Sequence, residues 1–290
     1  MKICLKCQAS FASSTWICPQ CGSEPESRAG FLCFAPDPDG QAGFSSGYFA
    51  QLYELESKNF WFRARNALLQ WAVRHYFPQA HSLLEVGCGT GFVLAGLEQA
   101  FPGLQLAGTD IFTEGLAMAR SRAPGIEVFQ MDACRMPFHE EFDVIGAFDT
   151  LEHIDRDEQV LAEFRRSCKP GGGIILTVPQ HPFLWSAADE YAFHKRRYTR
   201  QDLLSKIVRA GFDPLYVTSF VSLLLPLMVA SRARRKSLDA RFDPLEEFRI
   251  HPALNRALEL VLALERSFIK AGLSFPMGGS LLAVARRKES

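Results

Sequence analysis

Two hydrophobic periods alternate along residues 82–220. Short apolar runs such as "SLLEVG" and "FDVIGAFD" have the length and composition of buried strands. Between them lie segments in which apolar residues recur every three or four positions, the period of a helix packed on one face. Regular alternation of the two patterns predicts an α/β fold with a doubly wound, mostly parallel sheet.

The turn residues between these patterns set the expected boundaries. The predicted strands are residues 82–87, 104–110, 126–132, 142–149, 172–179, 213–220 and 280–287. The predicted helices are residues 48–77, 92–101, 112–123, 156–168 and 199–212. Thr199 fits the N-cap of the last helix, and Gly211 fits the position just beyond its end. Ligands of such sheets bind at the carboxyl ends of the strands, where Asp110, Asp132 and Asp149 fall.

The last two predicted strands are separated by an insert, residues 224–279, that contains two further helical patterns. The second of them, residues 251–272, is strongly amphipathic, and the first is followed by the basic run "RARRK" at residues 232–236. One interpretation is a cap over an apolar substrate or a surface that sits on anionic lipid. The other is a homodimer interface or a packing extension. The apolar stretch of residues 217–230 is shorter than the roughly 20 residues that span a bilayer, and Pro226 interrupts it.

Four cysteines form two C-x-x-C pairs near the N-terminus: Cys4 with Cys7, and Cys18 with Cys21. Two such knuckles supply the four thiolates of a tetrahedral Zn²⁺ site with no open position, which predicts a structural zinc ribbon over residues 1–24. A redox C-x-x-C pair is the alternative interpretation. Residues 25–47 are rich in Pro, Gly, Ser and Asp and are predicted to be a linker, and residues 48–290 form the second domain.

Composition narrows the class of protein. The 290 residues are 48% apolar, which is enough for a large core. Lys plus Arg and Asp plus Glu both number 32, so charge offers no argument for nucleic-acid binding. The N-terminus has no long apolar run, so we expect a cytoplasmic protein with reduced thiols, peripheral at the inner membrane face if the insert sits on lipid.

A glycine-rich loop, "LLEVGCGTG" at residues 83–91, follows the first predicted strand. Its glycines, Gly87, Gly89 and Gly91, have the spacing G-x-G-x-G instead of the dinucleotide G-x-G-x-x-G, and no Gly-Lys-Ser/Thr follows. Glu85 lies two residues before the first glycine. A carboxylate there suits a cationic ligand group better than a pyrophosphate.

Five motifs in this order resemble the class I S-adenosylmethionine-dependent methyltransferases, in particular the subgroup that acts on small molecules and quinone- or lipid-like substrates. They are "LLEVGCGTG", "GTDI", "QMDA", "FDVIGAFDTLEHI" and "KPGGGIILTVP", and the resemblance covers about residues 60–215. It implies a seven-stranded, Rossmann-like sheet and S-adenosyl-L-methionine as the methyl donor. The insert before the last strand departs from the family pattern.

The resemblance also implies the residues that hold the donor. Glu85 is expected at its ammonium group, Asp110 at the ribose hydroxyls and Asp132 at the adenine amino group. The Ala133 backbone N–H is expected to donate to the adenine ring, which Ile111 flanks, and Phe148 is expected beside the sulfonium. "NFWFRAR" at residues 59–65 resembles the family's N-terminal lid, in which Trp61 would close the site and Arg65 would reach the donor carboxylate.

Methyl transfer depends chiefly on holding donor and acceptor together, and an O–H or C–H acceptor also needs a general base. The candidates are His153, just after the fourth predicted strand, and His181 and His194, in the long segment after the fifth. The sequence therefore predicts a methyltransferase for a small-molecule or lipid-like acceptor. The alternatives are an RNA or protein methyltransferase that uses the zinc ribbon for recognition, and a binding protein that retains the donor site without turnover.

Overall fold

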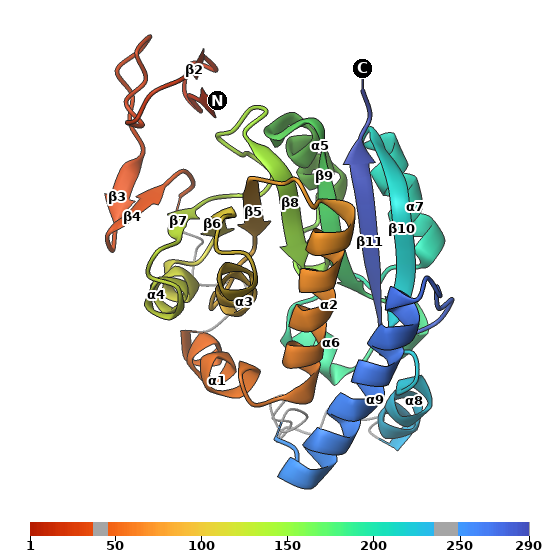
Figure 1. The fold of residues 1–290 in the computed structure, drawn as a ribbon. Coiled ribbons are helices and arrows are strands. Elements are labelled where there is room, and N and C mark those ends of the chain that lie inside the picture. Colours follow the sequence, from red (N-terminus) through yellow and green to blue (C-terminus); the bar gives the residue numbers. More distant parts are fainter. Residues whose placement is uncertain (37–45, 235–248, 290) are drawn as a thin grey trace.

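A single large sheet organises the chain in the computed structural model, which describes residues 1–36, 46–234 and 249–289. Its strand order is β10-β11-β9-β8-β5-β6-β7-β4-β3, with helices on both faces (Figure 1). The seven predicted strands are all present: β5 (Ser82–Val86), β6 (Gln105–Asp110), β7 (Glu127–Gln130), β8 (Phe142–Phe148), β9 (Cys168–Pro179), β10 (Phe212–Phe220) and β11 (Ser280–Arg287). The predicted Rossmann-like α/β fold is confirmed.

Strand direction places a crevice at the centre of the sheet. β5 pairs in parallel with β6 on one side and with β8 on the other, and β11 runs antiparallel between β9 and β10. The chain therefore winds in one direction from β5 to β7 and in the other from β8 onward. Ligands of doubly wound sheets bind at such a switch point, beyond the carboxyl ends of the strands.

Two additional strands extend the sheet, so it has nine strands in the described chain instead of seven. β3 (Glu26–Arg28) and β4 (Phe31–Cys33) form a hairpin, and β4 pairs in parallel with β7. The prediction of a linker is therefore wrong for residues 26–33. Phe31 and Cys33 are buried, and the pairing satisfies backbone groups that β7 would otherwise present as a free sheet edge.

The side chains of the central strands alternate between two cores. On β9, Ile174 and Leu176 pack on the face covered by α5 (Asp157–Ser167) and α7 (Arg200–Arg209). Ile175 packs on the opposite face, with α2 (Phe60–Tyr76), α3 (Phe92–Ala100) and α9 (Pro252–Lys270). The predicted boundaries of α7 are confirmed, since Thr199 accepts the Asp202 N–H and Gly211 has a φ of 86° just beyond the C-cap.

The helix predicted over residues 48–77 is divided in two, which corrects the sequence-based boundary. α1 (Ser46–Glu56) ends before Asn59, whose side chain caps α2 (Phe60–Tyr76) by accepting the Trp61 N–H. Both segments carry the same three-to-four-residue period, so the pattern alone did not show the break. Because the chain turns here, α1 lies beneath α3 and α4 (Thr113–Arg122), away from the axis of α2 (Figure 1).

The predicted insert forms α8 (Leu225–Arg234) and α9 (Pro252–Lys270), while residues 235–248 lie outside the described residues. α9 packs along α2, where Arg63 and Glu259 form an ion pair at 2.5 Å and Asn255 accepts the Phe60 N–H at 2.9 Å. Among the helices that the structure describes, none combines the length and apolarity needed to cross a membrane.

The N-terminal segment docks on the edge of the large sheet. β1 (Lys2–Ile3) and β2 (Ser10–Phe11) pair with each other, and the Ile3 N–H donates to the Pro137 carbonyl at 2.9 Å. The Trp16 ring packs edge-on against Phe34 at 4.5 Å and Phe129 at 5.8 Å between centroids. These contacts hold the N-terminal segment against the large sheet domain of the same chain, at Phe34, Phe129 and Pro137.

Candidate functional site

A large cavity opens at the carboxyl ends of β5, β6 and β8, with a volume of about 970 Å³. Most residues predicted from the sequence line it: Trp61, Arg65, Glu85, Gly87, Gly89, Asp110, Ile111, Asp132, Ala133, Phe148, His153 and His194. Gly91 and His181 do not line it. The structure therefore brings together residues from seven segments of the chain in one space large enough for two ligands.

The glycine loop curls tightly between β5 and α3. Gly87 has a φ of 75°, and a Cβ there would lie 2.4 Å from Thr150 Cγ2. Gly91 has a φ of 74°, and its Cβ would lie 2.7 Å from the Ala119 Cα on α4. The need for glycine at Gly91 thus comes from helix packing, whereas Gly89 offers its backbone to the cavity.

Asp110 ends β6 and braces this loop. Its two carboxylate oxygens accept the N–H groups of Gly89 and Phe112, both at 2.9 Å. Burial raises the pKa of Asp110 to about 6, against the effect of those N–H groups. Each carboxylate oxygen keeps a second acceptor position, so Asp110 can hold the loop and a ligand hydroxyl together.

Glu85 is 2% exposed, and its Oε2 atom has no hydrogen-bond partner in the described chain. Burial raises the pKa of Glu85 to about 8, and the nearby Arg65 charge only partly offsets this. A buried carboxyl oxygen without a partner is costly, so its environment favours a ligand that brings a proton donor or a positive charge.

Another part of the cavity lining is apolar with one acid. Ile111, Met131 and Ala133 line it. Asp132 accepts the Cys134 N–H through Oδ1 at 2.8 Å. A slot between apolar side chains with a carboxylate at its edge suits an aromatic base that carries an amino group.

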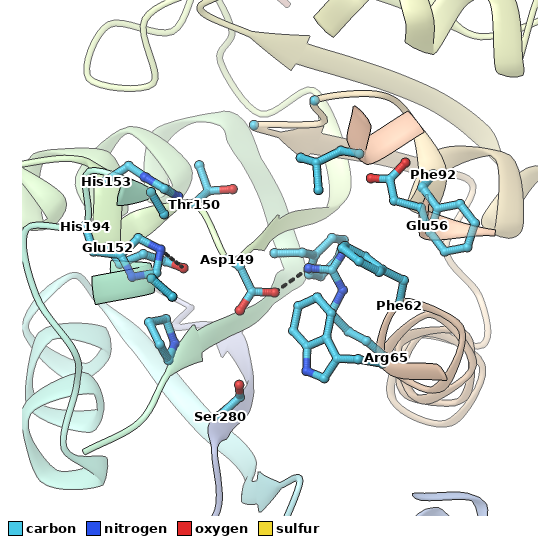
Figure 2. A pocket seen from close by; sticks show the side chains of 18 of the residues that line it. Glu56, Phe62, Arg65, Phe92, Asp149, Thr150, Glu152, His153, His194 and Ser280 are labelled. Carbon is cyan, nitrogen blue, oxygen red and sulfur yellow. Dashed lines mark hydrogen bonds and ion pairs between the residues drawn. The ribbon is translucent and has the colours of Figure 1, made fainter. Parts of the chain in front are cut away.

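Arg65 on α2 also lines the cavity, and its charge acts on Glu85. Arg65 forms an ion pair with Asp149 (Figure 2). Asp149 follows β8 and has a φ of 56°. The Thr177 hydroxyl donates to the same carboxylate oxygen of Asp149 at 3.1 Å. The Trp61 ring covers the guanidinium at 4.6 Å. The predicted lid residues thus form a wall of the cavity, with Arg65 held by Asp149.

A second ion pair, which the sequence did not predict, ties α1 to the glycine loop. Glu56 accepts hydrogen bonds from Arg122 and from the Thr90 hydroxyl, each at 2.5 Å. Arg122 also donates to the Tyr53 carbonyl and lies 4.0 Å above the Tyr53 ring. Because Phe49 and other α1 residues line the cavity, this pair holds α1 over the site.

His194 faces the cavity from the segment between α6 (Ala187–Tyr191) and α7. Its Nδ1 atom lies 2.9 Å from Asp189 Oδ1, and Arg197 donates to the same oxygen at 2.7 Å. Burial opposes ionisation of Asp189, but the hydrogen bond from His194 and the Arg197 charge outweigh it and lower its pKa to about 2. An ionised Asp189 accepts the Nδ1 proton and leaves Nε2 as the basic nitrogen of the neutral ring.

Glu152 and His153, on η1 (Leu151–His153), lie beside His194 (Figure 2). Glu152 Oε1 is 4.0 Å from His194 Nε2, and the two imidazole rings are 4.7 Å apart. Burial, followed by the Asp149 charge, raises the pKa of Glu152 well above its usual range, whereas burial lowers that of His153 to about 3. His153 is therefore neutral and a poor base, although the three side chains are close enough to coordinate a cation.

His181 lies apart from this cluster. It precedes η2 (Pro182–Leu184), its ring packs at 4.9 Å from Phe183, and burial lowers its pKa. Since His181 does not line the cavity, the geometry favours His194 among the three predicted histidines.

The four N-terminal cysteines gather at one point. The Sγ atoms of Cys4 and Cys21, and those of Cys7 and Cys18, are 3.6 Å apart, and all four lie within 4.8 Å of one another. Zn–S bonds of about 2.3 Å in a tetrahedron separate sulfurs by roughly 3.8 Å. Gly22, directly after the second pair, has a positive φ of 68°, and the Cys7 N–H helps to lower the pKa of Cys4 to about 6. The donor set fits a structural Zn²⁺ ion.

We expect the purified chain to hold one zinc ion and the Cys18→Ser variant to lose it, because a segment this small folds only around its metal. Zinc content and the melting temperature would both fall, and Cys134→Ser would serve as the control because Cys134 lies outside the cluster. Equal zinc content in wild type and Cys18→Ser, measured by atomic emission, would rule the site out.

Comparison with known proteins identifies the centre of the chain. Residues 84–176 match the family model described as "Methyltransferase domain", and they include the glycine loop, Asp110, Asp132 and His153. The chain carries a class I S-adenosylmethionine-dependent methyltransferase domain. Among curated relatives, it is 35% identical over 101 residues to the demethylmenaquinone methyltransferase of Chlorobaculum parvum, covering 34% of this chain and 42% of that protein.

One further curated relative and one solved structure are also similar to this chain. The ubiquinone biosynthesis O-methyltransferase of Azoarcus sp. is 27% identical over 121 residues, covering 40% of this chain and 51% of that protein. Phosphoethanolamine N-methyltransferase 2 of Haemonchus contortus, solved with S-adenosyl-L-methionine, superposes with a TM-score of 0.58 at 17% identity over 86% of this chain and 59% of that one. The chain spans about two fifths of the length of the first curated relatives, and the structural likeness shows the fold.

Proposed function

We propose that this chain transfers the methyl group of S-adenosylmethionine to a small-molecule or lipid-like acceptor, with His194 as the general base. One observation carries the proposal. A single cavity is lined both by the glycine loop, Asp110 and Asp132 and by His194 and apolar side chains of α8 and α9. Donor and acceptor can therefore meet in one site.

The donor fits the polar side of this cavity. Glu85 suits an ammonium group, Asp110 suits a ribose diol, and the slot at Asp132 and Ala133 suits adenine. Phe148, the last residue of β8, lies between these positions and His194. Bound S-adenosylmethionine supplies an electrophilic methyl group on sulfur, so the protein's task is to align the acceptor and exclude water. α1 and Trp61 line the cavity and would exclude water from it.

His194 then removes the acceptor proton. Asp189 holds the imidazole through Nδ1, so Nε2 takes the proton while the acceptor atom forms its bond to the methyl carbon and the carbon–sulfur bond breaks. The products are the methylated acceptor and S-adenosylhomocysteine, and the proton leaves on His194. The demethylmenaquinone and ubiquinone methyltransferases among the curated relatives support a small-molecule or lipid-like acceptor.

Transfer of a labelled methyl group tests the proposal. The zinc-loaded chain is incubated with methyl-labelled S-adenosylmethionine and separate lipid, small-molecule, RNA and protein fractions of a cell extract. We expect label in the lipid or small-molecule fraction. Label confined to RNA or protein would support the alternative acceptor class instead. Binding of the donor without transfer to any fraction would mean that the chain is not an enzyme.

Donor binding should also release a proton. Glu85, with a pKa of about 8, is protonated in most free molecules at pH 7, and an ammonium group beside it would stabilise the carboxylate. Affinity for S-adenosylhomocysteine should therefore rise from pH 6 to pH 8, and calorimetric heats should differ between phosphate and Tris buffers. Glu85→Gln should abolish the difference. Heats that are the same in both buffers for the wild type would contradict this assignment.

A further inference from the structure

α9 presents an apolar face to solvent as well as to the core. Leu258, Leu262 and Ile269 are buried against the domain. Residues on the other side are apolar and exposed at a spacing of three or four: Ala253, Ala257, Leu260, Leu264 and Phe268. Leu260 is 57% exposed, Leu264 52% and Phe268 40%. A helix that packs on one side only normally turns polar residues outward, so this second face indicates a further contact.

The exposed face continues onto α8 and into the cavity. Leu227 on α8 is 56% exposed and Leu254 on α9 is 51% exposed, and both line the cavity. The segment just before α8 is attached to α9, since Glu265 accepts the N–H groups of Ser222 and Leu223 at 2.7 and 2.8 Å. The two helices lie close together at one end of the molecule (Figure 1). Leu227 and Leu254 thus connect the exposed apolar surface to the cavity.

Aromatic residues are exposed in neighbouring segments of the chain. Trp185, which follows η2, and Tyr191 on α6 are 38% and 44% exposed. Arg232 on α8 donates to the Leu184 carbonyl, so α8 and η2 lie side by side. Tryptophan and tyrosine side chains are favoured at the level of lipid headgroups.

The insert is basic although the chain is neutral. Residues 224–279 contain nine Lys or Arg and six Asp or Glu. Of the acids that the structure describes there, Glu265 is buried and Glu259 pairs with Arg63 and Arg256. Arg249, at the cavity, and Lys270, at the end of α9, are exposed. Positive charge around an exposed apolar face matches an anionic bilayer.

We propose that the exposed face of α8 and α9 docks on an anionic lipid bilayer, and that the acceptor is an amphipathic lipid that enters the cavity from it. The second part rests on the proposed function. A second copy of the chain on this face would cover Leu227 and Leu254 and close the entrance, whereas a bilayer would supply the acceptor through it. An apolar tail would then lie between α2, α8 and α9, with the reacting group at His194.

Vesicle sedimentation tests this surface. The full zinc-loaded chain is mixed with vesicles of phosphatidylcholine alone or of phosphatidylcholine and phosphatidylglycerol in equal parts. We expect binding to the mixed vesicles and weaker binding to the neutral ones. The double variant Leu260→Asp with Leu264→Asp should lower the partition coefficient by about tenfold or more. The matched control, Ile17→Asp with Val208→Asp, changes equally exposed residues on the ribbon and on α7 and should bind as the wild type does.

Three results would overturn the proposal: no vesicle binding by the wild type, an equal loss in both double variants, or a wild-type dimer that the α9 variant converts to a monomer. Calorimetry with S-adenosylhomocysteine on each variant separates the two proposals. Donor binding without vesicle binding would reject the surface alone. Vesicle binding without donor binding would reject the proposed function and leave the surface intact.

Discussion

Asp110→Asn should weaken the binding of S-adenosylhomocysteine by roughly 10- to 100-fold. Hydrogen bonds that involve a charged group contribute about 1.5–3 kcal/mol each, and the substitution removes the charge that would accept the ribose hydroxyls. It also affects the loop, because the amide has one acceptor oxygen where the carboxylate uses two for the N–H groups of Gly89 and Phe112. Titration calorimetry measures the loss.

The control for this substitution is Asp213→Asn, whose side chain is 64% exposed on β10. It makes the same chemical change away from the cavity and should leave the affinity unaltered. The melting temperature of Asp110→Asn shows whether the glycine loop still folds. An Asp110→Asn variant that binds as tightly as the wild type would remove Asp110 from the site.

His194→Asn should lower the rate of methyl transfer by about 10²- to 10⁴-fold, the usual contribution of a positioned general base. Donor affinity should stay within a factor of about two, because the polar contacts expected of the donor lie at Glu85, Asp110 and Asp132. Asn can still form a hydrogen bond to Asp189 but cannot take up a proton. The measurement is the initial rate of label transfer to the reactive extract fraction, with donor binding followed separately.

His75→Asn is the matched control, since His75 is exposed on α2 and does not line the cavity. It should transfer label at the wild-type rate. The transfer rate of Asp189→Asn should lie between the rates of His194→Asn and His75→Asn, because Asp189 affects proton transfer through the orientation of His194. If His194→Asn retained the wild-type rate at every pH, the base would have to be sought elsewhere, or the acceptor would need none.

The strands were predictable because each one combines a short apolar run with a clear turn signal. β9, for example, contains the predicted run "GGIILTVP", whose buried side chains face both cores, although the strand begins four residues earlier, at Cys168, and includes the "KPG" expected to form the turn. The meeting of Asp110 and Asp132 in one cavity was predictable for a related reason. Asp110 and Asp132 follow directly from strand ends, and strand ends in a parallel sheet meet at one edge.

The residues that depend on tertiary contact were not predictable. Glu56 and Arg122 are 66 positions apart and carry no motif, and their pairing requires the break between α1 and α2. That break gives no signal in the hydrophobic period. Likewise β4 joins the sheet because β7 leaves an open edge, whereas its sequence context, rich in Pro and Gly, is typical of a linker.

The catalytic side was predictable only as a set of candidates. The sequence offered His153, His181 and His194 as candidates, and only the fold shows that His153 and His194 line the cavity whereas His181 does not. His194 is distinguished by Asp189, five residues before it, which the turn at the end of α6 brings within 2.9 Å of its ring. Sequence spacing alone does not show that contact.

The central claim is that the cavity beside the glycine loop binds the methyl donor. Titration of the zinc-loaded wild-type chain with S-adenosylhomocysteine, followed by calorimetry and by the shift in melting temperature, tests it most directly. We predict a single saturable site per chain and a melting temperature that rises with ligand concentration. Folded protein that gives neither heat nor a shift with S-adenosylhomocysteine or S-adenosylmethionine would contradict the account.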